Sequence, residues 1–156
     1  MDEQSSQFLT RFLESLPTDE RSKYHSFSSD YFCNDEENAN LCAQLVYDGI
    51  KTATCSLKLS YLAEGEPIPL TGHLQVVTNW HQEPVAIIEI TSVTECPYNE
   101  VTEEFAFAEG EGDRTLNWWR KAHWQFFTEE CQAIGIEPQD NMMLILERFK
   151  VVYRQT

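Results

Sequence analysis

One short segment of the chain carries residue types that could do chemistry: Gly49 to Ser56, which reads Gly-Ile-Lys-Thr-Ala-Thr-Cys-Ser. It combines a lysine with several hydroxyls where a helix is expected to give way to a strand. A lysine held near a threonine hydroxyl can bind an anion or help to activate a nucleophile. The alternative is an ordinary surface lysine followed by β-branched residues that favour strands.

Alternation along an extended strand would place Lys51 and Thr54 on opposite faces. Lys51 would be the first residue of this strand and lie at its rim, where irregular backbone lets its long side chain turn toward Thr54. Thr52 and Ser56 would share the face of Thr54. The segment therefore predicts a lysine and threonine pair at the start of a strand.

A second candidate is the acidic turn Glu109-Gly110-Glu111-Gly112-Asp113. Its glycines let the backbone approach a ligand closely, and Asp113 is placed to cap a following helix. The carboxylates could orient a lysine, accept hydrogen bonds from a base edge, or form an ordinary acidic surface turn.

The helix expected after this turn carries Trp118, Trp119, Arg120 and His123. Adjacent tryptophans cannot both face the core of one helix, so one of them could flank a pocket and stack on a base. The alternative is that Trp119, Arg120 and His123 are core and rim residues of a normally packed helix.

Helices are expected at both ends of a β-rich middle. Apolar spacing predicts a first helix through Phe8 to Leu16 that stops at Pro17. A second helix is predicted with Asn34 as its N-cap and Gly49 at its C-terminal end, and a strand is predicted to begin at Ile50.

The remaining elements complete a small mixed fold. Residues 65–72 read as a loop, and residues 72–80 and 85–93 read as two strands of a hairpin. Helices are predicted over 101–108 and 115–134. A last strand is predicted over 142–153, with Glu147, Arg148 and Lys150 on its surface. The pattern indicates an α+β domain around a small curled sheet or barrel.

Length and charge limit the function classes. A chain of 156 residues with 42% hydrophobic residues predicts one domain. Its 26 acidic and 11 basic residues give a formal charge of -15, which argues against nonspecific binding to a nucleic-acid backbone. Any nucleic-acid site must therefore be local.

The cysteines and histidines predict a cytoplasmic protein without a metal or other cofactor. The 5 cysteines are an odd number without a close pair, which is typical of reduced thiols. The histidines lack ligand spacing. The N-terminal residues lack the features of a signal peptide, and no apolar run is long enough to span a membrane.

Taken together, the motifs resemble the ASCH domain, a member of the PUA-like β-barrel superfamily. The segments that carry the resemblance are Tyr31 to Asn34, Leu45-Val46, Gly49 to Thr54, Pro69 to Gly72, Val76-Val77, Pro84 to Thr91, Glu109 to Asp113, Leu116 to Arg120 with His123, Phe126-Phe127 and Glu147 to Phe149. The resemblance is to the longer bacterial members. It implies an N-terminal helical extension over 1–29 and an ASCH domain over 30–156. Cys33 stands where many relatives have glycine.

The resemblance implies a PUA-like small mixed β-barrel with surrounding helices and a cleft for RNA or a modified nucleoside. Some members are similar to hydrolases of N4-acetylcytidine, and others are reported as ribonucleases. In the amidohydrolase branch a lysine and a threonine three residues apart act with a glutamate. That pattern implies catalytic roles for Lys51, Thr54 and Glu111, with Glu109 as the competing carboxylate.

The same cleft implies a set of substrate-binding residues: Thr52, Ser56, Glu109, Trp119, Arg120, His123 and Arg148. A noncatalytic RNA-binding module is the alternative function. The N-terminal extension could cover the site or form a homodimer contact.

Overall fold

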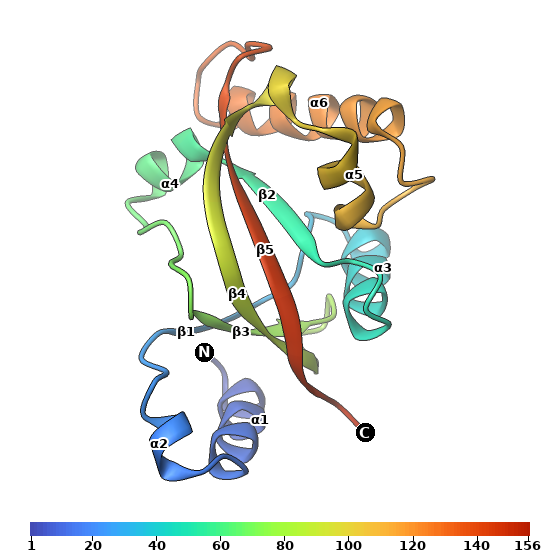
Figure 1. Cartoon of the computed structure of the whole chain (residues 1–156). Helices are drawn as coiled ribbons and strands as arrows, with labels where there is room; N and C mark the ends of the chain where they lie inside the picture. Colours follow the sequence, from blue (N-terminus) through green and yellow to red (C-terminus); the bar gives the residue numbers. More distant parts are fainter. The chain divides into compact units, whose positions relative to one another are not determined.

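The computed structural model describes all residues, 1–156, as a mixed α+β protein with a five-stranded sheet. The strand order is β1-β3-β4-β5-β2 (Figure 1). The expected α+β fold is confirmed, and the sheet is open rather than closed into a barrel. The strands are β1 Phe27–Asp30, β2 Ala53–Leu57, β3 Leu74–Thr78, β4 Pro84–Pro97 and β5 Met143–Arg154.

Two compact units share these strands. The first unit comprises 1–50, 70–91 and 149–156, and the second comprises 51–69 and 92–148. The two longest strands, β4 and β5, contribute residues to both units. None of the helices has the length and apolar composition that a membrane crossing requires.

In the first unit, the predicted N-terminal helix is α1, Glu3–Glu14. Asp2 caps it by accepting a hydrogen bond from the Ser5 amide at 2.8 Å. A short helix α2, Thr18–Arg21, follows Pro17. The apolar face of α1 packs in a cluster with β3 and β4 whose buried members are Phe8, Leu9, Phe12, Leu74, Val76 and Ile87.

The predicted hairpin is also confirmed: β3 and β4 are antiparallel, with a register shift at Val77/Thr78. Strand β1 pairs with β3 in parallel and was not predicted. With only four residues and no alternation of apolar and polar side chains, β1 carries little sequence signal.

The second predicted helix is α3, Glu36–Tyr47, and its N-cap is Asp35 rather than the expected Asn34. The Asp35 carboxylate accepts from the amide and the side chain of Asn38. At the other end the Gly49 and Ile50 amides bond to the Val46 and Leu45 carbonyls, with Gly49 at φ +75°. This is a glycine-terminated C-cap, as predicted.

In the second unit, β2 pairs with β5 in antiparallel register, with Thr54 opposite Glu147. The strand begins at Ala53, and the predicted start at Ile50 was too early. The amide of Ile50 closes the cap of α3, and the amide of Thr52 donates to the Ala108 carbonyl at 2.8 Å. These local hydrogen bonds keep residues 50–52 out of the sheet.

The helices of the second unit are α4 Lys58–Glu64, α5 Glu103–Glu109 and α6 Leu116–Ala133, with a 3₁₀ turn η1 at Tyr98–Glu100. Helix α4 was not predicted, because seven residues carry little periodic signal. The N-cap of α6 is Thr115, and the expected cap Asp113 instead accepts hydrogen bonds from Thr115.

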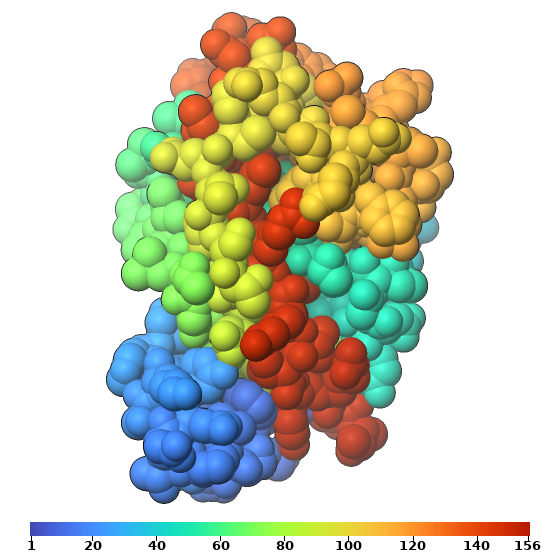
Figure 2. All heavy atoms as spheres, viewed as in Figure 1, coloured from blue at the N-terminus to red at the C-terminus, as the bar shows by residue number.

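The core of the second unit lies between one face of β2 and β5 and helices α5 and α6. Figure 2 shows the atoms of α5 and α6, in yellow to orange, next to one another. The largest fully buried residues of this cluster are Leu57, Phe105, Trp119, Phe127 and Leu144. This packing holds the end of α5 and the acidic turn against the start of β2.

Candidate active site

Lys51 is the central residue of the site, and it is only 1% exposed. Its ammonium Nζ donates to Glu111 Oε2 at 2.9 Å and to the Ala53 carbonyl at 2.9 Å. It also lies 3.5 Å from the Glu109 carbonyl oxygen. A buried ammonium is stabilised only when such partners replace its hydration, so the site is built to hold a positive charge.

The acidic turn supplies the carboxylate that pairs with Lys51. Helix α5 ends at Gly110 with φ +76°, and the turn continues through Gly112 with φ +59°. These left-handed conformations favour glycine and bring Glu111 back toward Lys51. Of the two glutamates predicted to compete, Glu111 forms the side-chain ion pair and Glu109 contributes its carbonyl.

Glu109 has a different set of partners. Its carboxylate is 1% exposed and accepts from Trp119 Nε1 at 2.7 Å and from His123 Nε2 at 2.9 Å. Burial opposes its ionisation, but the charges of Lys51 and His123 and the hydrogen bonds from His123 and Trp119 outweigh burial and lower the pKa of Glu109. Glu109 is therefore a buried carboxylate at neutral pH.

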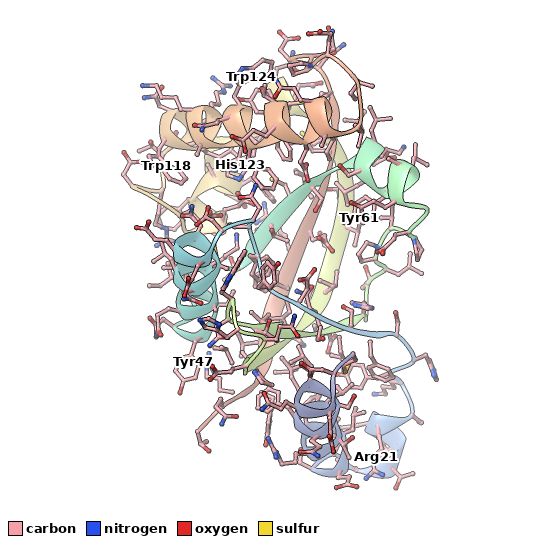
Figure 3. The ribbon with its side chains drawn as sticks, turned by 180° about the vertical axis from the view of Figure 1, so that it is seen from behind. Arg21, Tyr47, Tyr61, Trp118, His123 and Trp124 are labelled. Atoms are coloured by element: carbon pink, nitrogen blue, oxygen red, sulfur yellow. The ribbon has the colours of Figure 1, made fainter.

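His123 completes this network from α6 (Figure 3). Its Nδ1 lies 2.9 Å from the Trp119 carbonyl, so both ring nitrogens face acceptors and the imidazole can donate twice only when protonated. Burial lowers the pKa of His123, but Glu109 and Glu111 more than offset this and raise it. Two cations, Lys51 and His123, thus balance two carboxylates.

Thr54 lies one residue beyond the carbonyl that Lys51 binds. The Ala53 carbonyl belongs to the peptide bond that joins Ala53 to Thr54, so the ammonium is held 2.9 Å from the backbone just before the threonine. Thr54 is half-buried, and its hydroxyl makes no hydrogen bond in the structure. The hydroxyl is therefore available to a ligand.

Cys55, Glu109 and His123 each bring one potential metal-ligand atom within 4.8 Å of the others. Burial is the main cause that raises the pKa of the Cys55 thiol well above its usual range, and Glu109 adds to it. Metal binding requires a thiolate and an accessible carboxylate oxygen, whereas Glu109 already accepts from Trp119 and His123. These residues fit a hydrogen-bonded network better than a metal centre.

The other predicted binding residues occupy different environments. Thr52 is exposed and its hydroxyl donates to the Ala108 carbonyl, while Ser56 is half-buried on β2. Arg120 is exposed on α6. Arg148 pairs with Glu104 at 2.6 Å and lies over the Phe105 ring.

Trp119 is 1% exposed and stacks between Tyr98 and His123. This burial leaves no open face for a base, so the structure supports a positioning role for Trp119 through Glu109. The neighbouring Trp118 is half-buried and packs on Gly112, where an added Cβ would lie 2.2 Å from its ring.

Two residues near Thr54 were missed by sequence reasoning. Glu147 was expected on the surface of the last strand but is 6% exposed, and Tyr61 belongs to the unpredicted helix α4. For Glu147 the available signal was its alternate spacing with the buried apolar residues Ile145 and Phe149, two positions before and after it on β5.

A family model described as ASCH domain matches residues 28–153. A crystal structure of an ASCH domain from Lactobacillus crispatus JV V101 is 55% identical, covers 99% of this chain and 97% of its own, and superposes with a TM-score of 0.96. A protein from Enterococcus faecalis V583 is 31% identical over 99% of this chain and 91% of its own, with a TM-score of 0.84.

A more distant similarity concerns the fold alone. An ASCH protein from Zymomonas mobilis shares 8% identity over 82% of this chain and 68% of its own, with a TM-score of 0.50. A search of curated proteins found no match to the chain.

Proposed function

Because this chain belongs to the ASCH domain family, whose members are generally RNA-binding or hydrolase-like, we propose that it hydrolyses an amide of a modified nucleoside such as N4-acetylcytidine. Lys51, Thr54 and Glu111 are the residues proposed to carry the reaction. Ser56 and the exposed Arg120 are proposed substrate contacts.

The observation that carries this proposal is the buried ammonium of Lys51, held 2.9 Å from Glu111 and 2.9 Å from the carbonyl before Thr54. A fixed cation in a water-poor site stabilises negative charge that develops on a nearby carbonyl oxygen. The same cation would hold a phosphate if the ligand were a nucleotide.

In the proposed mechanism, Lys51 remains charged and stabilises the oxyanion of the tetrahedral intermediate through its electrostatic field rather than a direct hydrogen bond, because its N–H groups already face Glu111 and the Ala53 and Glu109 carbonyls. Thr54 Oγ1 is the nucleophile that attacks the acetyl carbonyl carbon. Glu111 is a positioning residue, because its ion pair fixes the Lys51 side chain. With its ammonium bonded to a carboxylate, Lys51 is poorly suited to take the Thr54 proton, so the reaction requires a separate base.

Charge favours a small substrate. The formal charge of -15 repels long polyanions, whereas a nucleoside or short single strand needs only local complementarity. A neutral nucleoside also avoids a competing interaction with the carboxylates Glu109 and Glu111.

The test is turnover of N4-acetylcytidine and of a mixture of modified nucleosides, followed by liquid chromatography and mass spectrometry. The wild-type protein is expected to release cytidine from N4-acetylcytidine, and Lys51→Met is expected to lower kcat/KM at least about 100-fold. Lys58→Met is the matched control, because Lys58 forms an ion pair with Glu95 nearer the surface. Full activity of Lys51→Met would refute the proposed site.

An RNA-binding module without catalysis, or a ribonuclease using the same cleft, is the second candidate. The half-buried Trp118 and the exposed Arg120 on α6 favour it, because an indole and a guanidinium can contact a base and a phosphate. This function predicts salt-sensitive binding of short single-stranded RNA that Lys51→Met weakens, without conversion of any nucleoside. Intact RNA incubated with the protein would show cleavage only in the ribonuclease case.

A further inference from the structure

The Glu147 side chain has no role in the site described so far, although it is unusually placed. It is 6% exposed and makes no hydrogen bond or ion pair in the structure. Burial of a carboxyl with no such partner favours its neutral form, so Glu147 binds a proton more readily than an exposed glutamate does.

Thr54 is the direct cross-strand partner of Glu147 in the antiparallel pair β2 and β5. Directly opposed residues lie on the same face of a sheet, with Cβ atoms about 4.5–5.5 Å apart. The free hydroxyl of Thr54 and the unpartnered carboxyl of Glu147 are therefore neighbours on one face. Ala53 and Leu57 lie on the other face, where they belong to the hydrophobic cluster that β2 and β5 form with α5 and α6.

The groups around Glu147 favour a carboxyl that exchanges a proton near neutral pH. Burial raises the pKa of Glu147 to about 7. Tyr61, on α4, has its own pKa raised mainly by burial, with Glu147 and Glu130 adding to the shift and a hydrogen bond with Ser56 opposing it. Figure 3 shows Tyr61 on α4.

Strand β5 itself places no positively charged side chain on the same face beside Glu147. Arg148, the next residue, lies opposite Ala53 and so on the other face, where Glu104 holds it at 2.6 Å. Glu130 on α6 also has a pKa raised to about 7, first by burial and then by Glu64. The Glu147 carboxyl thus shares its face of the sheet with the Thr54 hydroxyl, and burial alone accounts for its raised pKa.

We propose that Glu147 is the general base of the site and takes the Thr54 hydroxyl proton as Thr54 Oγ1 attacks a substrate carbonyl carbon. This inference rests on the proposed amide hydrolysis and supplies the base which that mechanism lacks. Thr54 and Glu147 lie opposite one another in the strand register, so the transfer needs no rearrangement of the sheet.

The proton balance closes over two steps. In the first, the Thr54 oxygen bonds to the carbonyl carbon, Glu147 accepts the hydroxyl proton, and the carbonyl electron pair becomes an oxyanion near Lys51. Collapse breaks the carbon–nitrogen bond, and protonated Glu147 gives its proton to the departing amine. In the second, Glu147 takes a proton from water, hydroxide attacks the Thr54 ester, and the proton returns to the threonine oxygen as the carboxylic acid leaves.

The test measures acylation of Thr54 without relying on a nucleoside. The protein is incubated with p-nitrophenyl acetate at pH 5 to 9, and the acetyl group on the Thr54 peptide is quantified by mass spectrometry. For the wild type, the acetylation rate is expected to rise with pH and to level off above about pH 7, as Glu147 loses its proton. Glu147→Gln is expected to lower the rate at least about 100-fold and to remove this pH dependence.

Glu130→Gln is the matched control, because it removes another carboxyl whose pKa is raised to about 7 but which does not lie opposite Thr54. Its acetylation rate is expected to stay within about 2-fold of wild type, since it takes no part in the proton transfer. Glu147→Asp keeps a carboxyl one methylene further away and is expected to retain a pH-dependent rate at a lower level. Glu147→Asp therefore decides the question if Glu147→Gln does not fold by circular dichroism.

Two results would overturn the inference: wild-type kinetics in Glu147→Gln, or absence of an acetyl group on Thr54 in wild-type protein quenched during the first turnover, before the ester is hydrolysed. Failure of the proposed function is distinguishable. If Thr54 is acetylated in a Glu147-dependent manner but N4-acetylcytidine and the other modified nucleosides are not hydrolysed, the base assignment stands and the substrate class is wrong.

Discussion

At the scale of single residues, the network around Glu109 shows how buried charges are stabilised. Trp119 and His123 donate to its carboxylate at 2.7 and 2.9 Å, and Lys51 is close enough to lower its pKa. Removing one donor leaves a buried carboxylate under-satisfied, which costs more than the hydrogen bond contributes on average. The indole nitrogen is the simplest donor to remove.

Trp119→Phe is therefore predicted to lower the free energy of unfolding by about 2 kcal/mol, combining the lost hydrogen bond to a charged group with a small cavity. Urea denaturation at pH 7 measures this change. Trp118→Phe is the control, because the Trp118 indole nitrogen makes no hydrogen bond in the structure and its ring is only half-buried. Equal losses in the two variants would contradict a role for the Trp119 hydrogen bond.

Lys51 affects stability as well as the proposed reaction. Lys51→Met leaves Glu111 and the nearby Glu109 without their cation at a site where water cannot replace it. A loss of about 3 kcal/mol is expected, the size typical for removing one partner of a buried pair. The double variant Lys51→Met with Glu111→Gln is predicted to recover part of this loss in the same urea assay, and no recovery would show that the Lys51–Glu111 pair is not the cause.

At the scale of elements, the turn between α5 and α6 determines where Glu111 lies. Gly112 has φ +59°, and a Cβ at this position would lie 2.2 Å from the Trp118 ring. A larger residue meets both the backbone strain and the ring, so the turn and its carboxylate must move. Gly65, which ends α4 at φ +67°, has the same backbone strain with nothing within 4 Å of its added Cβ.

The comparison of these two glycines predicts that Gly112→Ala lowers stability more than Gly65→Ala does. The cost of a left-handed alanine is about 1 kcal/mol at both positions, and the contact with Trp118 adds to it only at Gly112. Thermal denaturation of both variants measures stability, and N4-acetylcytidine turnover reports whether Glu111 still orients Lys51. A similar melting temperature in the two variants would mean that the Trp118 ring moves aside at little cost.

At the scale of the whole molecule, buried titratable groups link stability to pH, Glu147 and His123 in one direction and Glu109 in the other. Burial raises the pKa of Glu147 to about 7, while its unfolded value is near 4.5, so the unfolded chain releases this proton first as pH rises. Burial lowers the pKa of His123, but Glu109 and Glu111 raise it above its ordinary value, so its contribution to stability is lost as pH rises through that raised pKa. The pKa of Glu109 is lowered against burial by Lys51 and His123, so its contribution is lost only in acid.

The protein is therefore predicted to be most stable near pH 4.5 and to lose stability as pH rises from about 4.5 to 7, the interval between the unfolded and the folded pKa of Glu147. Melting temperatures across this range test the prediction. Glu147→Gln should flatten the decline, because the shift of one buried carboxyl from 4.5 to about 7 corresponds to at most about 3 kcal/mol. A decline of unchanged slope in Glu147→Gln would show that Glu147 is not its cause and leave Glu130, His123 and the formal charge of -15, of which the net-charge effect is the one that added salt relieves.

The local sequence determined the long helices and strands and two of the segments that form the site. The apolar spacing of α1, the glycine after α3 and the hairpin of β3 and β4 were predicted, since helix ends and strand alternation depend on neighbouring residues. The motif around Lys51 and Thr54 and the acidic turn were also identified from the chain. The α+β class followed from the order of these elements.

Only the tertiary structure decided which partners each carboxylate meets. Glu109 and Glu111 lie two residues apart in a flexible acidic turn. The packing of α5 and α6 on β2 brings the Glu111 carboxylate to Lys51 and the Glu109 carboxylate to Trp119 and His123. The burial of Glu147 and its place opposite Thr54 depend on the register of β2 with β5, strands separated by most of the second unit. Register and burial arise from contacts between distant residues, and no local pattern in the chain encodes them.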